Sequence, residues 1–146
     1  MNISDYGIIG NCRSSALVSR SGSIDWCCLP DFDSPSVFAR LLDDEKGGYF
    51  GISVKGDYSV TQKYFENTNI LETFYNSNEA AFEIYDFMPV YRTEEPNYYN
   101  SPELYRIFRR IKGMSEIRFE YFPGLNYGNP TKGLIERNFI KHVTTE

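Results

Sequence analysis

Short runs in which apolar and polar residues alternate, each closed by glycine, proline or asparagine, recur along the chain. The clearest is 116–121, where Ile117, Phe119 and Tyr121 alternate with charged residues. A period of two puts successive side chains on opposite faces of an extended strand, so each run predicts a strand with one buried face. Other such runs are 50–54, 58–64 and 82–88, the last interrupted by Asp86. Many short strands separated by turns predict an all-β fold, an antiparallel sandwich or barrel.

The composition agrees with this interpretation. Of the 146 residues, 16% are aromatic and 41% are hydrophobic. Tyrosine and phenylalanine fit the half-buried surface of a pleated sheet, so this aromatic content favours strands. The length suits a single domain with a core of its own, and no internal repeat or linker is visible. We therefore expect residues 1–146 to form one β-sandwich domain.

One segment departs from the strand pattern and predicts a helix. Ser34 can cap the amide groups of a first helical turn, and Pro35 suits the first helical position. Gly47 and Gly48 follow and would end the segment. The apolar face of this helix would consist of Val37, Phe38, Leu41 and Leu42. We expect one short helix near residues 35–44, packed onto a sheet.

Charge and cysteine content argue against several classes of protein. The formal net charge is −5, whereas nucleic-acid binding needs a basic face. The main basic cluster, 106–112, is flanked by acidic residues and is interpreted as a solvated strand face. No run approaches the ~18 apolar residues of a membrane span, and the first residues lack the features of a signal peptide. Three cysteines without Cys-x-x-Cys spacing predict reduced thiols and a cytoplasmic location.

The sequence offers few residues for nucleophilic catalysis or metal binding. The only histidine, His142, is expected on the solvent-facing side of the last strand, and a Ser-His-Asp or Cys-His arrangement needs a histidine as base. The cysteines lack the spacing of a zinc site, and Cys27 and Cys28 are expected to pack in the core. We therefore expect no catalytic residue, no metal site and no cofactor in this chain.

The segment 26–34 carries the candidate binding residues. Asp31 and Asp33 lie two apart, so an extended segment would project both to one side. Glycoside hydrolysis requires two carboxylates, but these must flank the scissile bond, which neighbours on one loop do not. Roles in a turn or a helix cap are the favoured alternative for both. Trp26 is either a platform that stacks on a sugar ring or the largest residue of the core.

The block 22–43, which contains Trp26, Phe32 and the Asp31–Asp33 pair, closely resembles a known pattern. It is similar to the N-terminal domain of the glucoamylase-like and trehalase-like enzymes of glycoside hydrolase family 15. The resemblance departs at Asp31, where that family often has a basic residue, and at Cys27-Cys28. Further segments match in the same order along the chain: 5–11 and 16–18 before this block, and 64–73, 86–89 and 126–128 after it.

This resemblance implies an N-terminal antiparallel β-sandwich, part of a supersandwich, which agrees with the strand pattern. In full-length members it implies inverting hydrolysis of α-glucosidic bonds by glutamates in an (α/α)₆ barrel that follows the sandwich. That barrel is absent from residues 1–146, which are too few to contain it, so no catalytic residue is carried over. The implied role is non-catalytic: to scaffold the barrel of the same polypeptide. Its candidate contacts at the rim of the α-glucoside site are Trp26, Asp31, Phe32 and Asp33.

Three alternatives stay open. The chain could be a free-standing carbohydrate-binding module that uses exposed aromatic residues, or itself an enzyme that uses Asp25, Asp31 or Asp33. The family's sandwich is usually longer than this chain, so an open sheet edge could also pair with a second copy to form a homodimer. The substrate stays open as well, because starch fragments, dextran and trehalose are all hydrolysed within this group.

Overall fold

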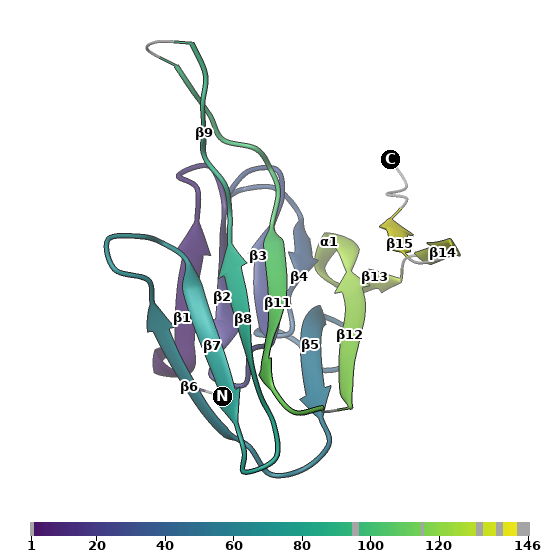
Figure 1. The fold of residues 1–146 in the computed structure, drawn as a ribbon. Helices are drawn as coiled ribbons and strands as arrows, with labels where there is room; N and C mark the ends of the chain where they lie inside the picture. The colour runs from purple at the N-terminus through teal and green to yellow at the C-terminus, as the bar shows by residue number, and fades with distance from the viewer. Residues whose placement is uncertain (1, 95–96, 115, 131–132, 137–138, 143–146) are drawn as a thin grey trace.

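Two antiparallel sheets packed face to face form the protein (Figure 1). The computed structural model describes residues 2–94, 97–114, 116–130, 133–136 and 139–142. The first sheet runs in the order β1-β2-β3-β5-β12-β13, with β4 paired to β3. Its strands are β1 (Tyr6–Gly10), β2 (Ser15–Ser19), β3 (Ile24–Cys28), β4 (Ser36–Phe38), β5 (Gly48–Val54), β12 (Ile117–Gly124) and β13 (Asn129–Pro130).

The second sheet runs in the order β11-β8-β7-β6. Its strands are β6 (Ser59–Tyr64), β7 (Leu71–Asn76), β8 (Ala81–Phe87) and β11 (Tyr105–Lys112). Two small hairpins are separate from both sheets: β9 (Tyr91–Arg92) with β10 (Tyr98–Tyr99), and β14 (Gly133–Glu136) with β15 (Phe139–His142). His142 lies in β15 opposite Gly133, and its side chain lies outside the described part of the chain.

The predicted all-β fold is confirmed, and the alternating runs are its strands. The run 50–54 lies in β5 and the run 116–121 begins β12, and the two strands pair so that Ile52 lies opposite Phe119. Apolar side chains of these runs pack between the sheets, except for Val60 and Tyr64 of the run 58–64, which are 38% and 45% exposed. One buried cluster contains Ile9, Val18, Ile24, Cys27 and Leu71, and a second contains Tyr75, Phe82 and Ile84.

The interruption of the β8 pattern at Asp86 is explained by a buried ion pair. Arg106 on β11 donates from Nε to Asp86 Oδ1 at 2.7 Å and from Nη2 to Oδ2 at 3.0 Å. Only 3% of the Arg106 side chain and none of the Asp86 side chain is exposed. Arg106 also donates to the backbone carbonyls of Phe50 and Gly22 in the opposite sheet, at 2.8 and 2.7 Å. The pair therefore ties the two sheets together.

The interpretation of 106–112 as a solvated strand face is therefore wrong for Arg106. It is correct for Arg109, which is 59% exposed and pairs with Glu83 at 2.7 Å, and for the exposed Arg110 and Lys112. Alternation along β11 puts Arg109 on the opposite face from Arg106, and therefore in water. Arg110 lies on the same face as Arg106 but nearer the end of the strand, where it is exposed.

The predicted helix near residues 35–44 is wrong. Ser36–Phe38 forms strand β4, in which Phe38 lies opposite Cys27 and packs edge-on against Tyr121 at 5.7 Å between ring centroids. Turns closed by Asp43 N–H to Ala39 C=O and by Gly47 N–H to Asp43 C=O follow the strand. Pairing with β3 and burial of Phe38 outweighed the local helix signals. Helical turns in the described residues are Ile3–Asp5 (3₁₀) and α1 (Leu125–Gly128).

The two edges of the sandwich differ. At the β1–β6 edge, the Tyr64 hydroxyl donates to the Ile8 carbonyl at 2.9 Å and accepts from the Ile8 N–H at 2.7 Å. At the other edge, β11 pairs with β8 alone within the described residues. There Phe108 and Phe119 contact each other between the sheets and yet are 40% and 46% exposed. The sandwich is thus closed on one side and open on the other.

No helix within the described residues has the length and apolar character needed to cross a bilayer.

Candidate functional site: a hollow between three loops

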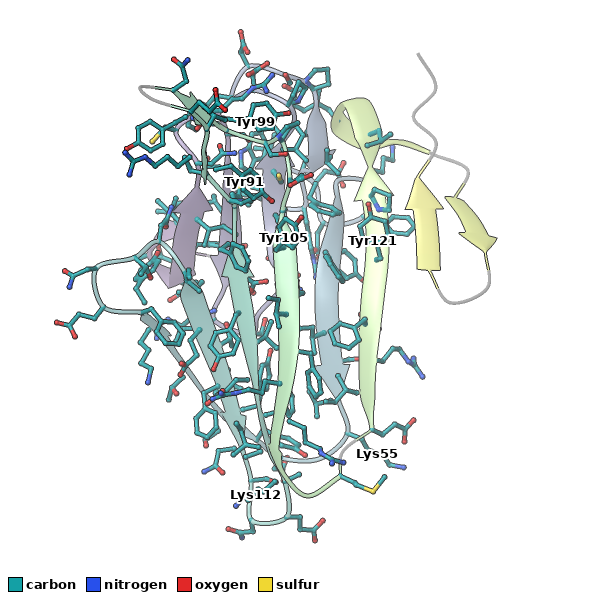
Figure 2. All side chains as sticks on the ribbon, turned by 45° about the horizontal axis from the view of Figure 1, so that its top comes forward. Lys55, Tyr91, Tyr99, Tyr105, Lys112 and Tyr121 are labelled. Carbon is teal, nitrogen blue, oxygen red and sulfur yellow. The ribbon has the colours of Figure 1, made fainter. Side chains whose placement is uncertain are left out.

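Three loops converge at one end of the sandwich. The β1–β2 loop and the β3–β4 loop lie at the same end as the β9–β10 hairpin (Figure 1). Figure 2 shows Tyr91 and Tyr99 at this end, far from Lys55 and Lys112. A hollow of about 620 Å³ opens between the loops, and we call it the loop hollow. It is lined by Cys12, Arg13, Asp31, Phe32, Asp33, Tyr98, Tyr99 and Asn100.

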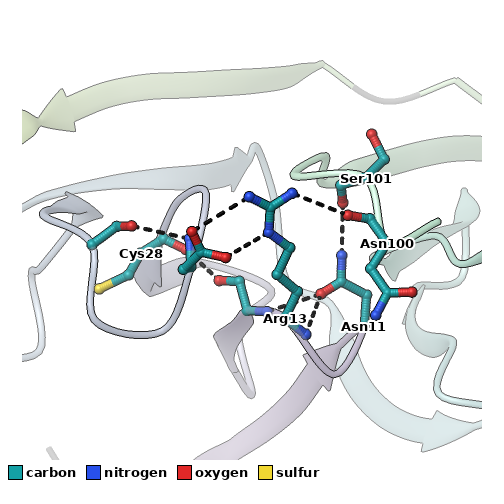
Figure 3. Close-up of polar contacts among 8 residues, drawn as sticks. Asn11, Arg13, Cys28, Asn100 and Ser101 are labelled. Atoms are coloured by element: carbon teal, nitrogen blue, oxygen red, sulfur yellow. Dashed lines mark hydrogen bonds and ion pairs between the residues drawn. The ribbon is translucent and has the colours of Figure 1, made fainter.

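A buried asparagine fixes the loops relative to each other (Figure 3). Asn11 is 1% exposed, and its Oδ1 accepts hydrogen bonds from the backbone N–H groups of Arg13 at 3.1 Å and Ser14 at 2.9 Å. Its Nδ2 donates to the carbonyl of Ser101 at 2.6 Å. Because one side chain satisfies backbone groups of two distant segments, it holds the β1–β2 loop against the segment that follows β10.

An ion pair crosses the hollow. Arg13 Nε donates to Asp31 Oδ1 at 2.5 Å, and Arg13 Nη2 lies 3.4 Å from Asp31 Oδ2. The Arg13 side chain is 35% exposed and the Asp31 side chain 44%, so both still face water. The hydrogen bond from Arg13 lowers the pKa of the Asp31 carboxyl. A carboxyl held ionised in this way is a hydrogen-bond acceptor and is ill-suited to act as a general acid.

Asp31 also begins a tight turn. Its N–H donates to Ser34 Oγ at 3.0 Å, and the Ser34 N–H donates to the Asp31 carbonyl at 3.1 Å. Ser34 thus closes a turn and does not cap a helix. The turn exposes Phe32 and Asp33 between these two residues, and Phe32 is 60% exposed.

The structure brings three of the four predicted rim residues together. Asp31, Phe32 and Asp33 line the loop hollow, whereas Trp26 lies half-buried in β3 opposite Leu17 and is absent from its lining. Asp25 is 1% exposed and accepts hydrogen bonds from Ser23 Oγ at 2.5 Å and from the Tyr6 hydroxyl at 2.9 Å. Asp25 is thus enclosed by its own partners and does not face the hollow.

Sequence reasoning missed the other side of the hollow. Tyr98 and Tyr99 are 69% and 52% exposed. The backbone carbonyl of Asn100 accepts a long hydrogen bond, 3.5 Å, from Arg13 Nη1. No role was predicted for these residues from the sequence. The one signal in the sequence was two adjacent tyrosines in a polar segment, which does not reveal that they face Asp31.

The cysteines and acidic residues show no metal-binding arrangement. Within the described ranges, no group of three or more His, Cys, Asp or Glu side chains is placed to hold a metal ion. Cys12 is exposed, and Cys27 and Cys28 are buried and unbridged. Burial raises the pKa of the Cys27 thiol to about 12, which makes it inert as a nucleophile.

The chain is similar over most of its length to one family model and to several known trehalases. The family model described as "Trehalase-like, N-terminal" matches residues 1–144. A trehalase of Thermoplasma volcanium is 39% identical over 136 residues, which cover 91% of this chain and 21% of that protein. Trehalase 1 of Sulfolobus acidocaldarius is 35% identical over 128 residues, covering 88% of this chain and 20% of the relative. The chain thus spans about a fifth of the length of these relatives. No solved structure gives a significant match.

Proposed function

This chain belongs to the trehalase-like N-terminal domain family, and from that membership we propose that it is the non-catalytic domain of a larger α-glucoside hydrolase. The bond-breaking residues would lie on a barrel domain of the same polypeptide, in an inverting enzyme of glycoside hydrolase family 15. The observation that carries this proposal is the extent of the match: 91% of this chain aligns with 21% of a trehalase. Among the glucoamylase, glucodextranase and trehalase types, the names of the relatives favour trehalase.

The sandwich supplies the properties of a scaffold. Its sheets are tied by the buried Arg106–Asp86 pair, and its loops are fixed by Asn11. We propose that the end bearing the loop hollow faces the barrel, so that Asp31, Phe32 and Asp33 contribute to the rim of the active site. Their exposure supports this, because loops on a rigid scaffold are where binding residues concentrate. Trp26, half-buried in β3, would contact the partner domain elsewhere.

The test compares the polypeptide that carries a barrel with the 146-residue chain. We expect the longer polypeptide to release glucose from trehalose or another α-glucoside and the 146-residue chain to release none, because the bond-breaking residues would lie on the barrel. Glucose release by the 146-residue chain that disappears in the Asp31→Asn/Asp33→Asn double variant would refute the proposal and identify a self-sufficient enzyme.

The open edge of the sandwich supports a further part of the proposal. Strand β11 exposes Ile107 and Ile111, each 47% exposed, beside a backbone edge that pairs with no other strand in the described part of the chain. Such an edge pairs readily with another strand. With no barrel attached, we expect two copies to associate through β11, so that the apparent mass in sedimentation equilibrium rises with concentration. Ile107→Lys should restore the monomer mass, and a wild-type chain that stays monomeric at high concentration would exclude this homodimer.

The cysteines support the proposed cytoplasmic location. All three are free, and the two buried ones pack in the sandwich without a bridge. Unbridged thiols are typical of proteins in a reducing compartment.

A further inference from the structure

We propose that the loop hollow is a subsite for one neutral, unphosphorylated glucosyl unit, with Tyr99 and Phe32 as its apolar walls and the Arg13–Asp31 pair as its hydrogen-bonding floor. The inference rests on the proposed function and deepens it, because it names the residues that bind sugar and the class of sugar they select. Tyr99 and Arg13 lie outside the segment that sequence analysis singled out. The volume, about 620 Å³, falls within the ~300–1,000 Å³ of small-molecule sites.

The aromatic residues give the first argument. Phe32, Tyr98 and Tyr99 come from two separate loops, and all three are more than half exposed although they line one hollow. Exposed rings gathered in this way leave a large apolar area in water, which a ligand with a flat apolar face would cover. A pyranose ring presents such a face through its C–H groups.

The polar groups give the second argument. Two contacts of the ion pair are long: Asp31 Oδ2 lies 3.4 Å from Arg13 Nη2, and Arg13 Nη1 lies 3.5 Å from the Asn100 carbonyl oxygen. Weak contacts leave a carboxylate acceptor and a guanidinium donor side by side for neighbouring hydroxyl groups. Asn100, which lines the hollow, has a buried Oδ1 without a hydrogen-bond partner in the described structure.

Charge decides between neutral and phosphorylated sugars. The charged lining residues are Arg13, Asp31 and Asp33, which leave the hollow with an excess of one negative charge. Arg13, the only cation among the described lining residues, is already paired with Asp31 at 2.5 Å. A phosphate group would meet the carboxylate of Asp33 without a free cation to receive it, so phosphorylated sugars are repelled.

The kinetic test uses the polypeptide that carries the barrel. Tyr99→Ala and Phe32→Ala should each raise KM for the α-glucoside about tenfold and leave kcat within about twofold, because a remote subsite binds substrate and transition state alike. The matched control is Phe122→Ala, since Phe122 is 55% exposed but lies on β12 outside the hollow. Asp33→Asn should lower the ratio of kcat/KM for the neutral sugar to kcat/KM for the phosphorylated sugar at least threefold. Unchanged KM in both hollow variants would overturn the proposal.

A binding test on the 146-residue chain separates this inference from the proposed function. Titration with trehalose at millimolar concentration, followed by NMR, should shift resonances of residues 31–33 and 98–100 in the wild type and not in Tyr99→Ala. If the longer polypeptide has no hydrolase activity, the proposed function fails, while these shifts still support a sugar site. Shifts confined to other surfaces would overturn the subsite. If trehalose shifts resonances in the hollow but Tyr99→Ala and Phe32→Ala leave KM unchanged, the hollow is not a subsite of the hydrolase. That result would favour a free-standing carbohydrate-binding module.

Discussion

Replacing Asp86 by alanine is expected to lower the free energy of unfolding by about 3–5 kcal/mol, because it leaves the Arg106 guanidinium buried without a counter-charge. Arg106 is 3% exposed, so water cannot replace the lost partner without opening the sandwich. Burial raises the pKa of the Asp86 carboxyl and Arg106 opposes that rise, so the ionised form depends on this partner. Urea unfolding followed by circular dichroism measures the effect.

An exposed ion pair in the same fold provides the control. Lys55 and Glu116 lie 3.6 Å apart with 81% and 71% of their side chains exposed, so Glu116→Ala should cost less than about 1 kcal/mol. Removing both buried charges, in Asp86→Leu/Arg106→Met, should cost less than the two single variants together, although the carbonyls of Phe50 and Gly22 then lose their donor. Equal effects of Asp86→Ala and Glu116→Ala would show that the buried pair does not stabilise the fold.

Gly48→Ala is expected to destabilise the protein by about 2–5 kcal/mol, through backbone strain of ~1–2 kcal/mol and overpacking of ~1–3 kcal/mol. Gly48 has a φ of +75°, which L-residues other than glycine rarely adopt. A Cβ atom there would lie 2.2 Å from the Gly124 backbone nitrogen and 2.5 Å from the Phe122 carbonyl oxygen. Both atoms belong to β12, which pairs with β5 at this point, so no side-chain movement relieves the clash.

Gly56→Ala separates the two causes. Gly56 also has a positive φ, +107°, but the nearest atom to its added Cβ is Tyr58 Cε2 at 3.7 Å. This variant should carry only the conformational penalty of ~1–2 kcal/mol. Thermal or urea unfolding of both variants gives the difference, and equal destabilisation would mean that the close approach of β5 to β12 is unimportant.

The strands were predictable from the sequence because their signal is local. In β12 the alternation of Ile117, Phe119 and Tyr121 with charged residues needs only an inner and an outer face. Ile117 and Tyr121 do pack against the buried clusters, whereas Phe119 contacts Phe108 at the open edge and stays 46% exposed. The same local reasoning failed at Ser36–Phe38. There the capping and propensity signals were sound, but strand pairing with Cys27 and packing on Tyr121 decided the conformation, and neither partner is near in sequence.

The candidate binding residues were likewise only partly predictable from the sequence. Asp31, Phe32 and Asp33 were found because they are contiguous and fall in a block that resembles a known family. Arg13 and Tyr99, which face them, were missed, because they come from loops 18 residues before and about 70 residues after Asp31 in the chain. Trp26 belongs to the same block yet does not line the hollow, since it lies within β3 opposite Leu17, before the β3–β4 loop begins.

The class of fold and the family were thus predictable from the sequence alone, because alternation and motif order depend on neighbouring residues. Three features depend on tertiary contacts: Arg106 enters the core to meet Asp86, residues 36–38 form a strand, and three distant loops line one open hollow. The physical reason is that burial, ion pairing and convergence of loops depend on which segments the two sheets bring together, and a local pattern carries no information about its distant neighbours.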